Sequence, residues 1–110
     1  MANRFALAIL VATLVSCGRD PGRGAAAIGR YGCGSCHTIP GITSAHGLVG
    51  PPLTGLRNRM YIAGVLPNTP ENVARWIADP KAVDEKTAMP KLGVTGADAS
   101  DIATYIYSLK

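Results

Sequence analysis

The sequence predicts one all-α domain, because its apolar residues recur at helical spacing in a chain of suitable length. Two stretches repeat apolar residues at i, i+3 and i+4, which places them on one face of a helix. These are Val73, Trp76 and Ile77, and then Ile102, Tyr105, Ile106 and Leu109. The chain has 110 residues, of which 5% are aromatic, so a core of side chains alone would be thin. Such a small fold is expected to enclose a non-protein group that supplies apolar surface.

The amino terminus has the composition of a bacterial export signal. One early positive charge, Arg4, precedes an apolar run over residues 5–12, which is too short to span a bilayer. The sequence Leu14-Val15-Ser16-Cys17 resembles a lipoprotein signal, in which the cysteine is acylated and becomes the first mature residue. We therefore expect a signal peptide over residues 1–16, a lipidated tether over 17–24 and the domain over 25–110. An ordinary signal or an uncleaved anchor is the alternative.

The basic charge carries no inference of nucleic-acid binding. The formal net charge is +4, and removal of residues 1–16 takes Arg4 away and leaves +3. Scattered lysines and arginines of this kind are typical of a solvated surface.

A first helix is expected to begin at Ala25-Ala26-Ala27-Ile28, a run of good helix formers, and to continue toward Cys33. Gly29 and Gly32 are poor helix residues. Their presence predicts the close approach of another helix, because only glycine lets two backbones come so near.

Residues Cys33-Gly34-Ser35-Cys36-His37 carry the strongest chemical signal. Positions i and i+3 share one face of a helical turn, so both thiols can add to the two vinyl groups on one edge of a porphyrin. His37 would then present an imidazole nitrogen to the iron. The spacing is typical of covalent haem c attachment. A redox-active cysteine pair would favour a βαβ context and a zinc site needs more cysteine or histidine ligands, and the sequence supplies neither.

With the stretch Gly50-Pro51-Pro52-Leu53, then Gly55-Leu56 and Arg59, the chain resembles class I c-type cytochromes from Ala25 to Lys110. The resemblance implies three to five helices wrapped around one haem, bound covalently through Cys33 and Cys36. It also implies that the Pro51 carbonyl accepts a hydrogen bond from His37, which orients the imidazole, and that Arg59 lies near a haem propionate. In this family the last helix crosses the first, so Gly29 or Gly32 is the expected contact of Tyr105.

A middle helix is predicted between Thr69-Pro70-Glu71, a capping threonine with proline in the first turn, and Asp79-Pro80. Trp76 within it is either a core residue or, as the resemblance implies, a neighbour of the haem on the methionine side. A last helix is predicted after Thr95-Gly96-Ala97-Asp98, which resembles a capping box.

Met89, followed by Pro90, stands where the family places its distal iron ligand. A thioether is a soft neutral donor, and a His/Met pair raises the reduction potential of haem iron. The alternative is a core methionine, although the polar residues around Met89 do not resemble a core. Met60 is a weaker candidate for the sixth position. His46, in a loop between the two motifs, is expected to be exposed rather than a second axial ligand.

These features predict a single-haem electron carrier with His37 and Met89 as axial ligands, not an enzyme, with no small-molecule substrate. The resemblance implies a quinol-oxidising complex as donor and a terminal oxidase as acceptor. The lipid on Cys17 would hold the protein to a membrane of the cell envelope, facing the periplasm. Lys81, Lys86 and Lys91 are candidates for a docking rim or for a solvated surface.

Two other functions stay open at this stage. A haem-based gas sensor or a small-molecule redox enzyme would need Met89 not to bind the iron, or to leave it readily. A structural or haem-delivery lipoprotein would not need Pro51, Arg59 and Met89 at their positions.

Overall fold

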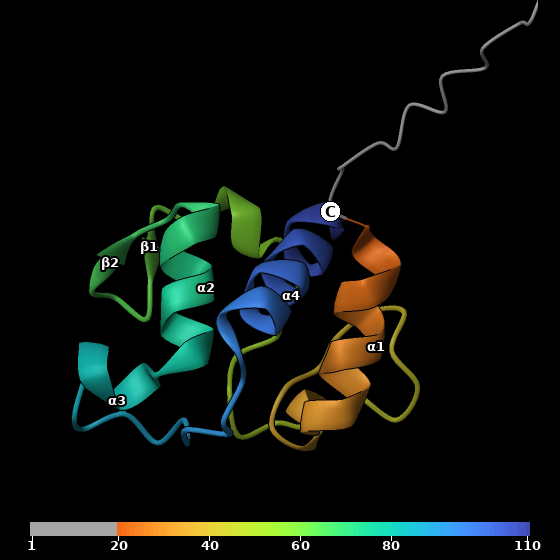
Figure 1. The fold of residues 1–110 in the computed structure, drawn as a ribbon, viewed down its shortest axis with the longest axis horizontal. Coiled ribbons are helices and arrows are strands. Elements are labelled where there is room, and N and C mark those ends of the chain that lie inside the picture. The colour runs from red at the N-terminus through yellow and green to blue at the C-terminus, as the bar shows by residue number, and fades with distance from the viewer. Residues whose placement is uncertain (1–19) are drawn as a thin grey trace, which may run out of the picture.

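Helices α1 and α4 lie side by side in the computed structural model, which describes residues 20–110, and α2 packs on the other side of α4 (Figure 1). Four α-helices, two short 3₁₀ helices and one two-stranded hairpin make up the described part of the chain. In chain order they are α1 (Pro21–Tyr31), η1 (Cys33–Ser35), η2 (Leu56–Asn58), β1 (Tyr61–Ile62), β2 (Leu66–Pro67), α2 (Pro70–Ala78), α3 (Pro80–Val83) and α4 (Gly96–Ser108). No helix among residues 20–110 is long and apolar enough to cross a membrane. The predicted signal peptide and Cys17 lie outside the described residues.

Helix α1 begins at Pro21, earlier than the predicted start at Ala25. Asp20 caps it, because its side chain accepts a hydrogen bond of 2.8 Å from the backbone N–H of Gly22, and proline is well suited to the first helical position. Residues 21–24 therefore belong to the helix, which corrects their assignment to a tether. The helix ends at Tyr31 and is capped by Gly32, whose φ of 69° is left-handed, a conformation that glycine adopts without strain.

The crossing of α1 and α4 occurs at Gly24, not at Gly29 or Gly32 as expected. A Cβ atom on Gly24 would lie 2.1 Å from the carbonyl oxygen of Asp101 and 2.7 Å from Cβ of Tyr105. A Cβ on Gly29 would meet no atom within 4 Å. Gly24 is thus the residue that lets the two backbones approach.

Threonine caps start both α2 and α4, as the sequence predicts. The Thr69 hydroxyl accepts a hydrogen bond from the N–H of Asn72 at 3.1 Å, and the Thr95 hydroxyl accepts one from Asp98 at 3.1 Å. Asp79 follows the last residue of α2 and also caps α3, since its side chain accepts from the N–H of Ala82 at 3.3 Å. The short helix α3 was not predicted from the sequence.

The hairpin is a second unpredicted element. Its antiparallel strands pair Tyr61 with Pro67 and Ile62 with Leu66. Asn68, directly after β2, fastens the preceding turn: its side-chain amide donates to the carbonyls of Leu56 and Arg59, both at 2.7 Å. The Tyr107 hydroxyl in α4 donates to the side-chain oxygen of Asn68.

The core fills the space between α1, α2 and α4. Ala27 and Ile28 of α1, Val73 and Ile77 of α2, and four apolar residues of α4 are buried together. Those four are Ala99, Ile102, Ala103 and Ile106. The apolar stripes that predicted α2 and α4 therefore face the interior.

Candidate haem site

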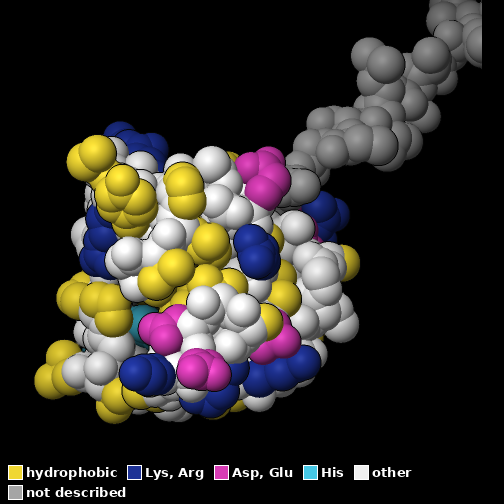
Figure 2. Space-filling model, turned by 90° about the vertical axis from the view of Figure 1, so that its left-hand side faces the viewer, with side chains coloured by type: hydrophobic (Ala, Val, Ile, Leu, Met, Phe, Trp, Pro, Cys, Tyr) yellow, Lys and Arg dark blue, Asp and Glu magenta, His cyan; other side chains and the backbone are white. Residues whose placement is uncertain are grey.

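A cavity of about 370 Å³ opens from this core, a size in the range of ligand pockets. Its walls are mainly aliphatic and come from segments far apart in the sequence. They include Ile28, Leu53, Leu56, Ile62, Val73, Ile102 and Ile106. Figure 2 shows the face that carries α2, α3 and the hairpin, where hydrophobic side chains gather between scattered charged ones. An apolar ligand of considerable size is the natural occupant of such a cavity.

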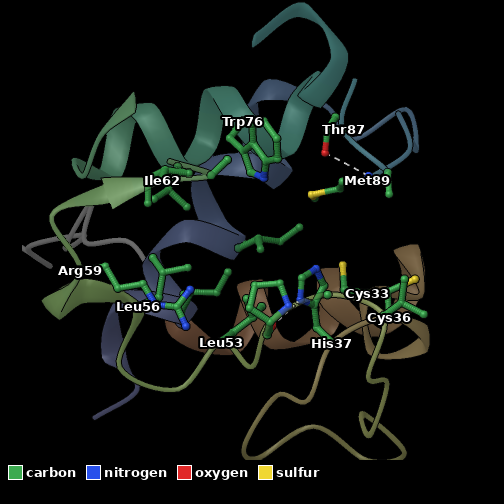
Figure 3. A pocket seen from close by; sticks show the side chains of 18 of the residues that line it. Cys33, Cys36, His37, Leu53, Leu56, Arg59, Ile62, Trp76, Thr87 and Met89 are labelled. Atoms are coloured by element: carbon green, nitrogen blue, oxygen red, sulfur yellow. Dashed lines mark hydrogen bonds between the residues drawn. The ribbon is translucent and has the colours of Figure 1, made fainter. Parts of the chain in front are cut away.

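The two cysteines and the histidine of the Cys-x-x-Cys-His motif lie together at one wall (Figure 3). They follow the left-handed Gly32 in a tight turn, in which the N–H of His37 donates to the Cys33 carbonyl at 3.1 Å. Both thiols are free. Burial raises the pKa of the Cys33 thiol, and the nearby Cys36 adds to this effect. A redox-active pair depends on a lowered pKa, so the shift at Cys33 is in the wrong direction for that alternative.

The imidazole of His37 is oriented by the backbone of the next motif. Its Nδ1 lies 2.7 Å from the carbonyl oxygen of Pro51. A carbonyl can only accept, so Nδ1 carries the hydrogen, and in the neutral ring Nε2 keeps its lone pair. The resemblance implied this contact, and the geometry leaves Nε2 of His37 as the nitrogen that can bind a metal.

Two glycines make room for this turn, a role that was not predicted from the sequence. A Cβ on Gly50 would lie 2.3 Å from Cε1 of His37, and one on Gly47 would lie 2.5 Å from the backbone of Cys36. The N–H groups of the same glycines donate to the carbonyls of Cys36 and Gly34, at 2.7 and 3.0 Å. Glycine on both sides of an exposed apolar pair, Leu48-Val49, is the available sequence signal.

Met89 lines the cavity across from His37, with its sulfur directed inward (Figure 3). The side chain is half-buried. Its backbone N–H donates to the Thr87 hydroxyl at 3.1 Å, which fixes the turn that presents the thioether. Met60 is 79% exposed and lies outside the cavity lining. Of the two internal methionines, Met89 is thus the one placed to face His37.

The other predicted site residues divide between the cavity and the surface. Trp76 and Arg59 both line the cavity, and Trp76 also packs against the core. The Arg59 guanidinium donates to the Pro52 carbonyl at 2.8 Å, beside the Pro51 carbonyl that orients His37. His46 is exposed, and its backbone pairs with that of Thr38. Residues 20–110 contain no cluster of three His, Cys, Asp or Glu side chains suited to a metal ion.

Fold and site together define a small helical domain with an apolar cavity between a cysteine-histidine turn and a methionine loop. The chain belongs to the cytochrome c family, whose sequence pattern, described as Cytochrome c, matches residues 22–110. Over 79 residues the chain is 34% identical to cytochrome c oxidase subunit 2 of Alkalihalophilus pseudofirmus, covering 71% of this chain. It spans only 22% of that relative. No solved structure gives a significant match.

Members of this family bind haem c covalently, and the residues of the cavity suit that group. The apolar walls match the porphyrin faces, and the two free thiols are spaced for its two vinyl groups. The imidazole of His37 and the thioether of Met89 are the donors found in haem proteins of this kind. Cys33, Cys36 and His37 would hold the haem, with Arg59 at the cavity wall as a cationic partner for a propionate.

Proposed function

We propose that this chain is a single-haem electron carrier of a bacterial respiratory chain, with His37 and Met89 as axial ligands of the iron. When bound, the haem supplies a one-electron iron couple. His37 and Met89 face each other across one apolar cavity (Figure 3). This opposition of the two donors is the observation that carries the proposal.

The protein residues have distinct tasks in this function. The Pro51 carbonyl fixes the tautomer of His37 and strengthens its nitrogen as a donor. The neutral thioether of Met89 favours ferrous iron and raises the potential. The aliphatic walls exclude water from the iron, which also raises the potential because ferric haem carries the larger charge. Two protein ligands leave no position for a substrate, so no enzymatic reaction is proposed.

The partners that we propose are a quinol-oxidising complex as donor and a terminal oxidase as acceptor. The oxidase is supported by the similarity of this chain to part of an oxidase subunit 2. Acylation of Cys17 would hold the domain to a membrane and face it toward the periplasm, where both partners can be reached by diffusion along the surface.

Binding of carbon monoxide to the reduced holoprotein tests the ligand set. The protein is made in a host that attaches haem c and is then mixed with carbon monoxide while the Soret band is followed. We expect no spectral change on mixing, because Met89 occupies the sixth position. The Met89→Ala variant is expected to bind carbon monoxide at once, since alanine offers no donor atom.

Rapid and tight binding by the unmodified protein would contradict the proposal. The iron would then have an open or yielding position, and a haem-based gas sensor or a small-molecule redox enzyme would be the better interpretation. Met60→Ala is the matched control, because Met60 is exposed and outside the cavity lining. That variant is expected to behave as the unmodified protein does.

A further inference from the structure

The loop that carries Met89 is fastened to the start of α3 at two points. Lys81 donates from Nζ to the Thr87 carbonyl at 2.6 Å, before Met89 in the chain. Lys91 forms an ion pair with Asp79, Nζ to Oδ2 at 3.3 Å, after Met89. We call these four residues, Asp79, Lys81, Thr87 and Lys91, the α3 clasp. Met89 thus lies between two attachments to one short helix.

The start of α3 is a firm base for these attachments. Pro80, its first residue, is among the fully buried side chains of the protein. Asp79 is held in turn, because its Oδ1 caps the N–H of Ala82 while Oδ2 meets Lys91. A buried proline with fixed φ and a capped first turn have little freedom to move. The loop is therefore attached to a segment, Asp79-Pro80, that is itself fixed against the core.

The first attachment is coupled directly to the backbone of Met89. Thr87 receives Lys81 at its carbonyl, and its hydroxyl accepts the N–H of Met89 at 3.1 Å. Thr87 also lines the cavity (Figure 3). A displacement of Thr87 would consequently move the peptide from which the thioether projects.

We propose that Lys81, together with the Asp79–Lys91 pair, is a positioning group that holds Met89 against the cavity and keeps the sixth position of the iron closed. This inference rests on the proposed function. Each contact is exposed and individually weak, so the clasp acts on how often the loop opens and not on whether the domain folds. Lys81 and Lys91, two of the three lysines considered as a docking rim, thus have intramolecular partners.

Lys86 provides a matched control within the same loop. It is exposed, and its ammonium makes no hydrogen bond or ion pair with any residue of the described segment 20–110. Lys81→Met and Lys86→Met remove the same charge from the neighbourhood of Met89. Only the first of them removes a tie to Thr87. A difference in behaviour between the two variants is therefore due to loss of the hydrogen bond to Thr87 and not to loss of the charge.

The rate at which cyanide binds to the ferric holoprotein tests the clasp. When Met89 must leave first, this rate reaches a plateau at high cyanide that equals the rate of loop opening. We expect Lys81→Met to raise the plateau about fivefold, the equivalent of roughly 1 kcal/mol. Asp79→Asn, which keeps a capping side chain but loses the ion pair, is expected to raise it about twofold to threefold.

Three further results decide the inference. Lys86→Met should leave the plateau rate at the value of the unmodified protein. Lys81→Arg can still donate to the Thr87 carbonyl, so its plateau rate should stay close to that value. Hydrogen exchange of the Met89 amide should quicken in Lys81→Met and stay unchanged in Lys86→Met. Equal plateaus in Lys81→Met, Asp79→Asn and Lys86→Met would overturn the clasp alone. A rate that never reaches a plateau in the unmodified protein would overturn the proposed function and the clasp with it.

Discussion

The orientation of one imidazole depends on two neighbouring residues that contribute only backbone. The Pro51 carbonyl accepts the hydrogen of Nδ1 of His37 at 2.7 Å. Gly50 lies so close to the ring that a Cβ would sit 2.3 Å from Cε1 and 2.7 Å from Nδ1. The Gly50 N–H is bound to the Cys36 carbonyl at 2.7 Å, so the glycine cannot withdraw without breaking the turn. The ring is thus held by a hydrogen bond on its edge and by close packing.

Gly50→Ala should therefore disturb His37 more than a single methyl group suggests. The ring or the turn must move, and overpacking of this kind costs about 1–3 kcal/mol of unfolding free energy. Urea unfolding of the holoprotein measures this loss, and the yield of haem per protein should fall as well. Gly96→Ala is the control, because a Cβ there meets no atom within 4 Å. Equal stability of the two variants would contradict the packing of Gly50 on His37.

At the scale of elements, the contact of α1 with α4 depends on one position. Gly24→Ala would drive a methyl group to 2.1 Å from the Asp101 carbonyl, which belongs to the backbone of α4 and cannot rotate away. We expect a loss of about 3 kcal/mol or more of unfolding free energy. Gly29→Ala, in the same helix but facing open space, should instead gain about 0.5–1 kcal/mol from better helix propensity. Thermal unfolding of both variants checks the sign of each change.

Similar losses in both variants would mean that the crossing lies elsewhere along α1. The difference between Gly24 and Gly29 also explains why the position of the helix crossing could not be predicted from the sequence. Propensity treats Gly24 and Gly29 alike, since each is a glycine in a helix. The difference between them arises from Asp101 and Tyr105, which are remote in the chain. Packing of distant segments is not recorded in a local pattern.

Other elements could be predicted where a few neighbouring residues encode them. Thr69 and Thr95 mark the starts of α2 and α4 through capping, a short-range interaction that three or four residues encode. Asp20-Pro21 carries the same kind of signal for α1, but the glycines around it favour a tether. The hairpin has strands of only two residues each, too short for an alternating pattern. In the site, the Cys-x-x-Cys-His motif predicts its own geometry, whereas Thr87 and Gly50 gain their roles only through contacts across the fold.

For the whole molecule, three tyrosine hydroxyls connect distant parts of the chain. Tyr105 donates to the Pro40 carbonyl at 2.6 Å, and Tyr107 donates to Asn68. Tyr31 of α1 donates to Asp98 of α4 at 2.6 Å. Of the three acceptors, only Asp98 titrates. The hydrogen bond from Tyr31 is the main reason that the pKa of the Asp98 carboxyl lies below its ordinary value, with Arg30 contributing as well.

This lowered pKa predicts how stability depends on pH. A carboxyl whose pKa is lower in the folded state contributes stability fully above its unfolded value, about 3.9 for aspartate, and loses it as the pH falls through the folded value. Tyr31→Phe should therefore destabilise the protein at pH 7, and its effect should shrink as the pH falls below about 4. Tyr105→Phe loses a bond to a carbonyl that does not titrate, so its cost, about 1 kcal/mol, should stay constant with pH. Urea unfolding of both variants between pH 7 and pH 3 measures how the loss of unfolding free energy in each variant changes with pH. A constant effect of Tyr31→Phe would show that the bond to Asp98 does not lower its pKa. If the effect shrinks as expected, protonation of Asp98 weakens this contact between α1 and α4 in acid.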